Sequence, residues 1–251
     1  SDATWQGTVN NGWSTNANWS VSAPGSGNTA TFDGAGNGNT NINLGGGVTV
    51  SNIYFESGSV AAYTIGTGGA GAQALTIEKA IWMAAGAGSD QTIDANVTLA
   101  NNAEFRNNIA GKVLTVNGDV TASAKQLTLY GFDNGGAINL AGTGNDWGGE
   151  TVIAGATVTA NSASAGNMNI EYGTLTLNAD QTLAGIDFGH ATLGNGDGTL
   201  NIGTGNTNAL SSGVTYTADD TSANTATIAG GTLEMAGGIQ NVEFNIADHA
   251  S

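Results

Sequence analysis

Three cations lie close together near the middle of the chain, where positive charge could act on an acidic sugar polymer. Arg106, Lys112 and Lys125 fall within 20 residues of one another. A polysaccharide lyase needs such a base, usually arginine or lysine, together with cations that neutralise the uronate. The alternative is that these are solvated surface charges on separate parts of the fold, so lyase chemistry is a minor hypothesis.

Carboxylates could support a different reaction, because a glycoside hydrolase needs two or three of them clustered around the scissile bond. Asp90 and Asp94 share a strand face if their segment is extended, and Glu104 follows closely in sequence. The excess of negative charge would repel an acidic substrate. We therefore interpret these carboxylates mainly as solvated charges.

Histidine offers little more. His190 lies three residues after Asp187, and a carboxylate at that spacing could orient an imidazole as a base. No serine or cysteine nucleophile motif accompanies the pair, and the other histidine, His249, lies in the tail. With two histidines and no cysteine, the sequence gives little basis for a zinc site.

Oxygen-rich turns leave calcium as the one cofactor that the sequence keeps open. Residues 195–200, Asn-Gly-Asp-Gly-Thr-Leu, partly resemble the glycine-rich nonapeptide that binds Ca²⁺ in β-rolls, although such sites need tandem copies. Ordinary Asx turns explain the same residues. The candidate ligands are the aspartates of these turns: Asp133, Asp146, Asp197, Asp219 and Asp220.

Three tryptophans cluster at the start of the chain, at Trp5, Trp13 and Trp19. We interpret them mainly as a cap, since the first coil of a solenoid must be covered to avoid aggregation through its open edge. The functional alternative is a glycan-binding platform, because indole faces stack on pyranose rings.

The elements that must position these residues are short strands of one kind. Each has an aliphatic residue, then Thr or Asn, then another aliphatic residue, which places the aliphatic pair on one face. Helical periodicity is nearly absent, and 41 glycines oppose helix formation. The motif recurs along the chain, for example at Val48-Thr49-Val50, Leu75-Thr76-Ile77, Leu114-Thr115-Val116, Leu175-Thr176-Leu177 and Phe244-Asn245-Ile246.

Self-similar strands separated by Asn-Gly and Gly-Gly turns of varying length favour a solenoid over a sandwich of hairpins. The predicted fold is all-β, a right-handed parallel β-helix with an N-terminal cap over residues 1–30 and about ten coils over residues 31–251. Residues 150–153 and 156–159 should form two sides of one coil with Gly155 at the corner. Residues 142–149 should project as a loop.

Composition excludes some partners. The formal net charge is −16, from 20 carboxylates and four cations. Nucleic acids and anionic lipids are bound by clustered Lys and Arg, so we expect no nucleic-acid partner. No apolar run approaches the ~20 residues of a membrane helix, so we expect no membrane insertion.

The segment from Gly142 to Val158 resembles the autotransporter-associated β-strand repeat of bacterial passenger domains, whose usual pattern is G-x-N-x-Y-x-G-x-T-x-I-x-x-G-T-L. Trp147 stands where that family has tyrosine, and residues 156–158, Ala-Thr-Val, replace Gly-Thr-Leu. Residues 5–20 resemble the segment that often precedes such repeats. The resemblance covers about a quarter of the chain and implies an exported, surface-displayed or released β-helix, with no chemistry of its own. Nothing in the sequence resembles the membrane barrel that ends an autotransporter.

The last strand lies close to the end of the sequence and could join another copy. Its apolar residues, Val242, Phe244 and Ile246, form the predicted assembly edge. Taken together, the sequence predicts an exported, non-enzymatic structural or adhesive solenoid that self-assembles into an extracellular filament, sheath or matrix after signal-peptide removal. The alternative is a glycan-binding surface adhesin, and a polysaccharide-acting enzyme comes third.

Overall fold

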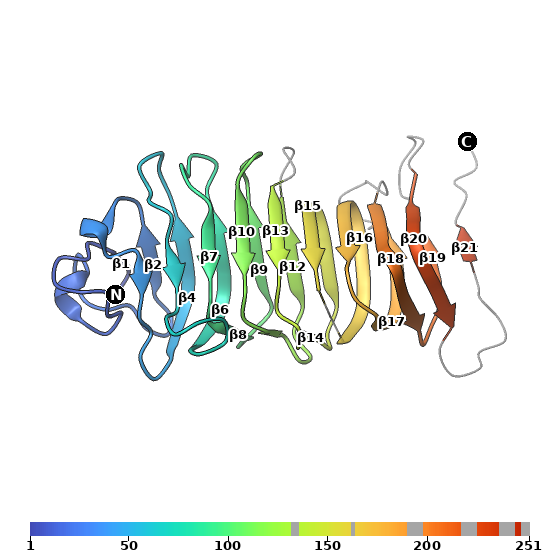
Figure 1. The fold of residues 1–251 in the computed structure, drawn as a ribbon, viewed down its shortest axis with the longest axis horizontal. Coiled ribbons are helices and arrows are strands. Elements are labelled where there is room, and N and C mark those ends of the chain that lie inside the picture. The colour runs from blue at the N-terminus through green and yellow to red at the C-terminus, as the bar shows by residue number, and fades with distance from the viewer. Residues whose placement is uncertain (132–135, 162–163, 190–197, 217–224, 236–243, 247–251) are drawn as a thin grey trace.

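The chain folds as an all-β rod in which the backbone coils about one axis (Figure 1). This computed structural model describes residues 1–131, 136–161, 164–189, 198–216, 225–235 and 244–246. Except for one isolated antiparallel bridge, between Trp5 and Trp19, every strand pairing in these ranges is parallel. The parallel β-helix predicted from the sequence is confirmed, with about nine turns in place of ten.

Three parallel ladders, which we call sides A, B and C, run along the rod, and the chain visits them in that order in every turn. The strands that keep to one side are β1 (Ala3–Thr4), β2 (Thr29–Phe32), β9 (Ala103–Asn107), β12 (Leu127–Tyr130), β19 (Val214–Tyr216) and β21 (Phe244–Ile246) on side A; β3 (Asn41–Ile42), β5 (Thr64–Ile65), β7 (Gln91–Ile93), β10 (Val113–Val116) and β13 (Ala137–Leu140) on side B; and β8 (Asn96–Leu99), β11 (Val120–Thr121) and β14 (Asp146–Trp147) on side C.

Longer strands bend at a corner and continue onto the next side. They are β4 (Val48–Phe55), β6 (Ala74–Met83), β15 (Thr151–Ala160), β16 (Ser164–Leu177), β17 (Gln181–Phe188), β18 (Gly198–Leu210) and β20 (Thr227–Met235). Helix is limited, in the described ranges, to two 3₁₀ turns, η1 (Asn16–Asn18) and η2 (Gly36–Gly38).

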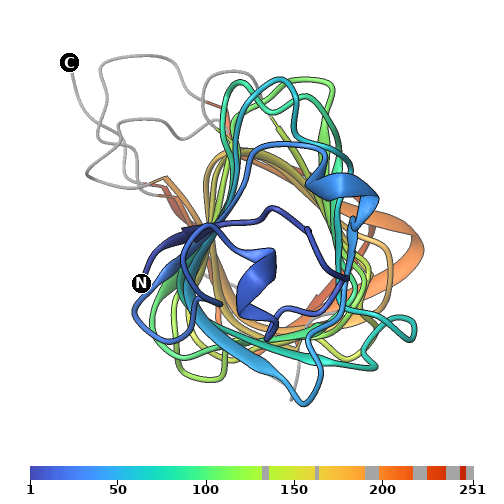
Figure 2. The same ribbon diagram turned by 90° about the vertical axis from the view of Figure 1, so that its left-hand side faces the viewer.

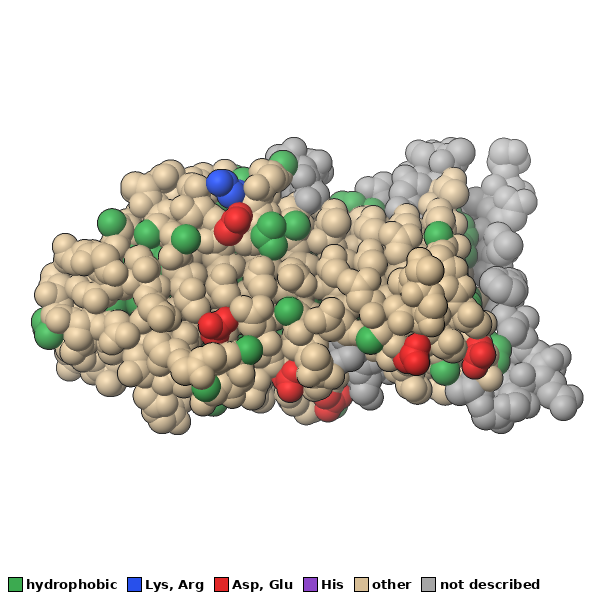
Figure 3. Space-filling view, viewed as in Figure 1, with side chains coloured by type: hydrophobic (Ala, Val, Ile, Leu, Met, Phe, Trp, Pro, Cys, Tyr) green, Lys and Arg blue, Asp and Glu red, His purple; other side chains and the backbone are tan. Residues whose placement is uncertain are grey.

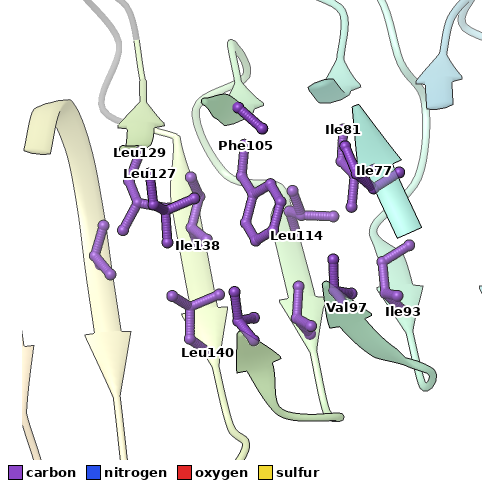
Figure 4. Packing of buried hydrophobic residues seen from close by; sticks show 14 of the residues in the cluster. Ile77, Ile81, Ile93, Val97, Phe105, Leu114, Leu127, Leu129, Ile138 and Leu140 are labelled. Atoms are coloured by element: carbon purple, nitrogen blue, oxygen red, sulfur yellow. The ribbon is translucent and has the colours of Figure 1, made fainter. Parts of the chain in front are cut away.

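The core consists of columns, because parallel register places equivalent residues of successive turns above one another. Figure 4 shows part of this packing. The inward column on side B is fully or almost fully buried and contains Ile42, Ile65, Ile93, Val116, Leu140, Ala160, Leu177 and Ile202. The corresponding column on side A contains Ile53, Ile81, Phe105, Leu129, Ile153, Ile170 and Phe188.

Coil length varies widely along the rod. The offset between stacked residues is 17 from Ile153 to Ile170 and 30 from Val214 to Phe244. Corners explain the difference, because some carry loops and others turn at a single glycine. Gly155 is such a corner: with φ of +78° it bends β15 between side A, where β15 pairs with β12, and side B, where it pairs with β13. The predicted role of Gly155 is therefore confirmed.

The segment 142–149 was expected to project as a loop, and that expectation is wrong. Asp146 and Trp147 form β14, which pairs with β11 on side C. Trp147 is fully buried in the core. The large indole contributes so much apolar surface that it is drawn inward despite the surrounding Gly, Asn and Asp.

The N-terminal segment lies across one end of the rod and closes it (Figure 2). Asn18 is fully buried there and ties the crossing together. Its Oδ1 accepts from the backbone N–H groups of Val9 (2.9 Å) and Asn10 (3.2 Å). Its Nδ2 donates to Asn10 Oδ1 (2.8 Å) and to the carbonyl of Gly12 (2.9 Å). The segment also joins the rod directly, since β1 pairs with β2 on side A.

Substituting Gly155 should destabilise the rod. A Cβ at this position would lie 2.2 Å from the carbonyl oxygen of Gly131 and 2.5 Å from the Tyr172 ring, in addition to the strain of positive φ. We expect Gly155→Ala to lower the free energy of unfolding by about 3 kcal/mol. Denaturant unfolding followed by circular dichroism measures this change.

Gly45→Ala is the matched control, because Gly45 also has positive φ (+60°) but nothing lies within 4 Å of the position that a Cβ would take. This variant should lose only about 1 kcal/mol. Equal losses in the two variants would contradict the role of close packing at the Gly155 corner.

Candidate functional site

The three N-terminal tryptophans are buried, and in this structure they form no glycan platform. Trp5, Trp13 and Trp19 are at most 3% exposed. Trp19 makes edge-to-face contacts with both other rings at 5.0 and 4.8 Å, and all three pack on Phe32. Their indole N–H groups donate to backbone carbonyls. Burial of the first coil accounts for them, as the cap interpretation expects.

The three central cations do not converge. Arg106 points outward from β9 on side A, whereas Lys112 lies in the loop between β9 and β10. Lys125 lies in the turn before β12, at the opposite edge of side A. The solenoid therefore separates residues that are close in sequence.

The proposed carboxylate cluster is also divided between sides. Asp90 and Asp94 flank β7 on side B, and each accepts a hydrogen bond from the next turn, from Val113 N–H (2.8 Å) and Asn117 Nδ2 (2.7 Å). Glu104 lies on side A. These acids support cross-turn contacts at their corners and do not share a site.

Most candidate metal ligands lie outside the described residues: Asp133, Asp197, Asp219 and Asp220, as do His190 and His249. Asp187 is described, on the outer face of β17, and Asp146 accepts from the N–H of Gly148 at 3.1 Å. Within the described ranges no three acidic or histidine side chains gather as a metal site would require. At the predicted assembly edge, Val242 lies outside these ranges, and Phe244 and Ile246 are described only as backbone of β21.

A groove on the outer face of side A brings together polar and charged side chains and one aromatic ring. Three columns of residues build it, because the register between β9, β12 and β15 aligns their outward positions. We define the side-A groove by its lining residues: Lys79, Asn102, Ala103, Glu104, Gln126, Thr128, Tyr130, Glu150, Val152, Ala154 and Glu171.

A ladder of aromatic rings with a cation inside it runs beside the groove and reaches its lining at Tyr130. The Arg106 guanidinium carbon lies 5.1 Å from the centroid of the Trp82 ring and 4.8 Å from that of Tyr130. Tyr54 extends the ladder by one turn with an edge-to-face contact to Trp82, at 5.0 Å between centroids. Such contacts hold four successive turns together from the outside.

The wall opposite the ladder is made of amides and a carboxylate at the corner between sides C and A. Gln126 N–H donates to Asn102 Oδ1 at 2.9 Å, and Gln126 Nε2 donates to Glu150 Oε2 at 2.7 Å. The floor between the walls has shorter side chains, in register from Thr128 to Val152. Long walls and a short floor produce two adjoining hollows of about 200 Å³ each, which share Gln126 and Thr128.

Charge in the groove is unevenly distributed. Glu104 forms an ion pair with Arg106 at 3.4 Å, so the guanidinium is neutralised locally. Glu150 and Glu171 line the second hollow, where no lysine or arginine is among the lining residues. Burial raises the pKa of Tyr54, and the carboxylates of Glu104 and Glu56 add to this, while Arg106 opposes it. Tyr54 is therefore neutral at physiological pH.

The rest of the visible surface is mainly uncharged. In the view of Figure 3, charged side chains are few and scattered, and polar neutral groups cover most of the face. Within the described ranges, no helix has the length and apolar character needed to cross a bilayer.

The sequence alone does not reveal the ladder, because Tyr54, Trp82 and Tyr130 stand far apart in the chain. They come together only because one coil is 28 residues long at Tyr54 and the next two are 24 each. Because the corners between strands differ in length, this spacing follows no fixed period in the sequence. An alignment of turns, once register is known, makes the ladder evident.

Comparison with known proteins adds no assignment. No protein-family profile matches the chain, and searches of curated proteins and of solved structures give no significant match. The resemblance to the autotransporter-associated repeat therefore stays a prediction.

Removing the cation from the ladder should weaken the rod. Arg106→Met keeps much of the aliphatic stem and loses two cation–π contacts and one ion pair that is partly exposed to solvent. We expect a loss of about 1–2 kcal/mol in the free energy of unfolding. Arg106→Lys, which keeps the charge but not the planar group, should lose less. Chemical denaturation at low and high salt measures both, and an unchanged Arg106→Met would show that the stack contributes nothing.

Proposed function

We propose that this protein is an exported, non-enzymatic β-solenoid whose side-A groove binds an extended polysaccharide. The observation that carries the proposal is the groove itself, which crosses the turns of β9, β12, β15 and β16 with polar walls and a short floor. Binding sites combine a concave surface with a few convergent polar groups and aromatic rings, as this groove does.

The repeat distance of the fold supports a linear polymer as ligand. Successive turns of a parallel ladder are about 4.8 Å apart. An extended chain of β-1,4-linked sugars advances by a similar distance per sugar. One sugar could thus lie against each turn, with its hydroxyls near the amides of Asn102 and Gln126 and the hydroxyl of Thr128. These groups both donate and accept hydrogen bonds, as sugar hydroxyls require.

This proposal moves the glycan-binding surface from the N-terminal tryptophans to side A. Export and display outside the cell remain part of it, supported by the acidic composition, the absence of cysteine and the few cations. The protein would act as a rigid spacer that holds sugar polymers, an adhesive role in keeping with a solenoid scaffold.

Filling the groove should strongly weaken the binding of the polysaccharide. Thr128→Trp places a large ring on the floor, where Thr128 lies between the two walls. Thr115→Trp is the matched control, since Thr115 is the outward residue of the same motif on side B, paired with Thr92 and Asn139. A labelled-glycan array followed by calorimetry should show at least a tenfold loss for the first variant and none for the second. Equal behaviour of the two variants would contradict the groove as the binding surface.

Self-association is our second proposal, and the last turns that the structure describes support it. Ile228, Leu233 and Met235 point inward from β20 but are only partly buried, whereas their partners in the preceding turn, Leu200, Asn208 and Leu210, are at 0% exposure. The opposite end is closed by the tryptophan cap, so stacking of that end on β20 would bury little more apolar surface. Two molecules would therefore join through their β20 ends, which gives a dimer of rods and not a filament.

Light scattering during size-exclusion chromatography tests this arrangement. We expect a monomer–dimer equilibrium, weakened at least tenfold by Leu233→Asn, which introduces the residue type that Asn208 provides one turn earlier. Thr232→Asn, at the neighbouring outward position, is the control. A monomer at all concentrations, or long filaments, would each overturn the paired arrangement.

A further inference from the structure

The aromatic ladder of side A changes character after Tyr130. Tyr130 pairs with Gly155 in the next turn, and the ring of Tyr172 from the following turn covers this glycine. The second hollow of the groove lies beside this point, over the short side chains of Val152 and Ala154 and between Tyr130 and Glu150. This recess beside Tyr130 has a volume of about 200 Å³.

Arg106, one turn before Tyr130, shows which kind of group binds between an aromatic ring and a carboxylate. Arg106 lies against Tyr130, 4.8 Å from its ring centroid, with Glu104 as its carboxylate partner at 3.4 Å. The recess offers the same two kinds of group, the Tyr130 side chain and the carboxylates of Glu150 and Glu171. A cation entering the recess would therefore meet the chemistry that already binds Arg106 within the chain.

We infer that the recess beside Tyr130 binds the protonated amine of an amino sugar, so that the polysaccharide held by side A contains 2-amino-2-deoxyhexose units. This inference rests on the proposed function and names the ligand class of the same groove. The ammonium group would pair with Glu150 and Glu171, and the ring of the sugar would lie near Tyr130. Attraction of an ammonium to a carboxylate and to an aromatic ring explains the selectivity.

Two features favour a sugar over a basic peptide as the source of the cation. The groove continues from the recess along Thr128, Gln126 and Asn102, whose hydroxyl and amides suit sugar hydroxyls. The second feature is the spacing of one turn per sugar, which lets neighbouring units of one chain use both hollows. Net charge agrees as well, because −16 over the whole chain attracts polycations and repels uronates.

Calorimetry with defined hexasaccharides tests the inference. The probes are a glucosamine hexamer, its fully N-acetylated form and a hexamer of galacturonate, at about pH 5.5, where most amines are protonated and carboxylates ionised. We expect the free-amine hexamer to bind at least tenfold more tightly than the acetylated one, and the uronate not to bind. Raising the ionic strength should reduce the difference.

Glu150→Gln is the decisive variant, because Glu150 is exposed and glutamine preserves an acceptor for Gln126. It should lose at least fivefold in affinity for the amine hexamer and little for the acetylated one. Glu171→Gln should act in the same direction. Glu234→Gln, an equal charge change on exposed β20, should leave binding unchanged.

The outcomes separate the inference from the proposed function. Equal affinity for amine and acetylated hexamers, with no effect of Glu150→Gln, overturns the amine site but leaves polysaccharide binding in place. Absence of binding to every glycan overturns both. Tighter binding of a lysine or arginine hexapeptide, lost in Glu150→Gln, would assign the recess to a protein partner and overturn the sugar.

Discussion

Parallel pairing between successive turns is the constraint on which the rest of the structure depends. Each turn hydrogen-bonds to the turns before and after it, so a residue's environment is set by its equivalents about 4.8 Å away along the axis. Inward positions must be apolar in every turn, which yields the continuous columns of the core. Outward positions obey the same stacking, so like side chains also gather on the surface. The Trp82–Arg106–Tyr130 ladder is this second consequence.

The sequence predicts the fold well because alternation is a local property. Leu75-Thr76-Ile77 and Leu114-Thr115-Val116 each show which residues face inward without any knowledge of their partners, and the structure buries both aliphatic residues of each. The corner at Gly155 is likewise local, since positive φ favours glycine. The burial of Trp147 is not a local property, because it depends on the space inside the coil. The turn-forming residues around Trp147 predicted a loop instead.

The groove could not be predicted, because it depends on register between turns and register depends on coil length. Offsets from 17 to 30 residues mean that no fixed period aligns Tyr54 with Trp82 or Glu104 with Thr128. Sequence reasoning therefore grouped Arg106 with Lys112 and Lys125, its neighbours along the chain. In the rod its neighbours are Glu104 on the same strand and the rings of the adjacent turns.

A single corner links the shape of the rod to the proposed site. At Gly155 the chain passes from side A to side B without a loop, and the positive φ and the close carbonyl of Gly131 leave no room for a side chain. The same glycine is the register partner of Tyr130, and the ring of Tyr172 from the following turn covers it, so no side chain of the glycine's own turn stacks on Tyr130. The recess lies beside Tyr130, over the short side chains of Val152 and Ala154 that lead to this corner, with Glu150 on its far wall. A corner that turns at a single glycine therefore shapes both the coil and the surface that borders the proposed site.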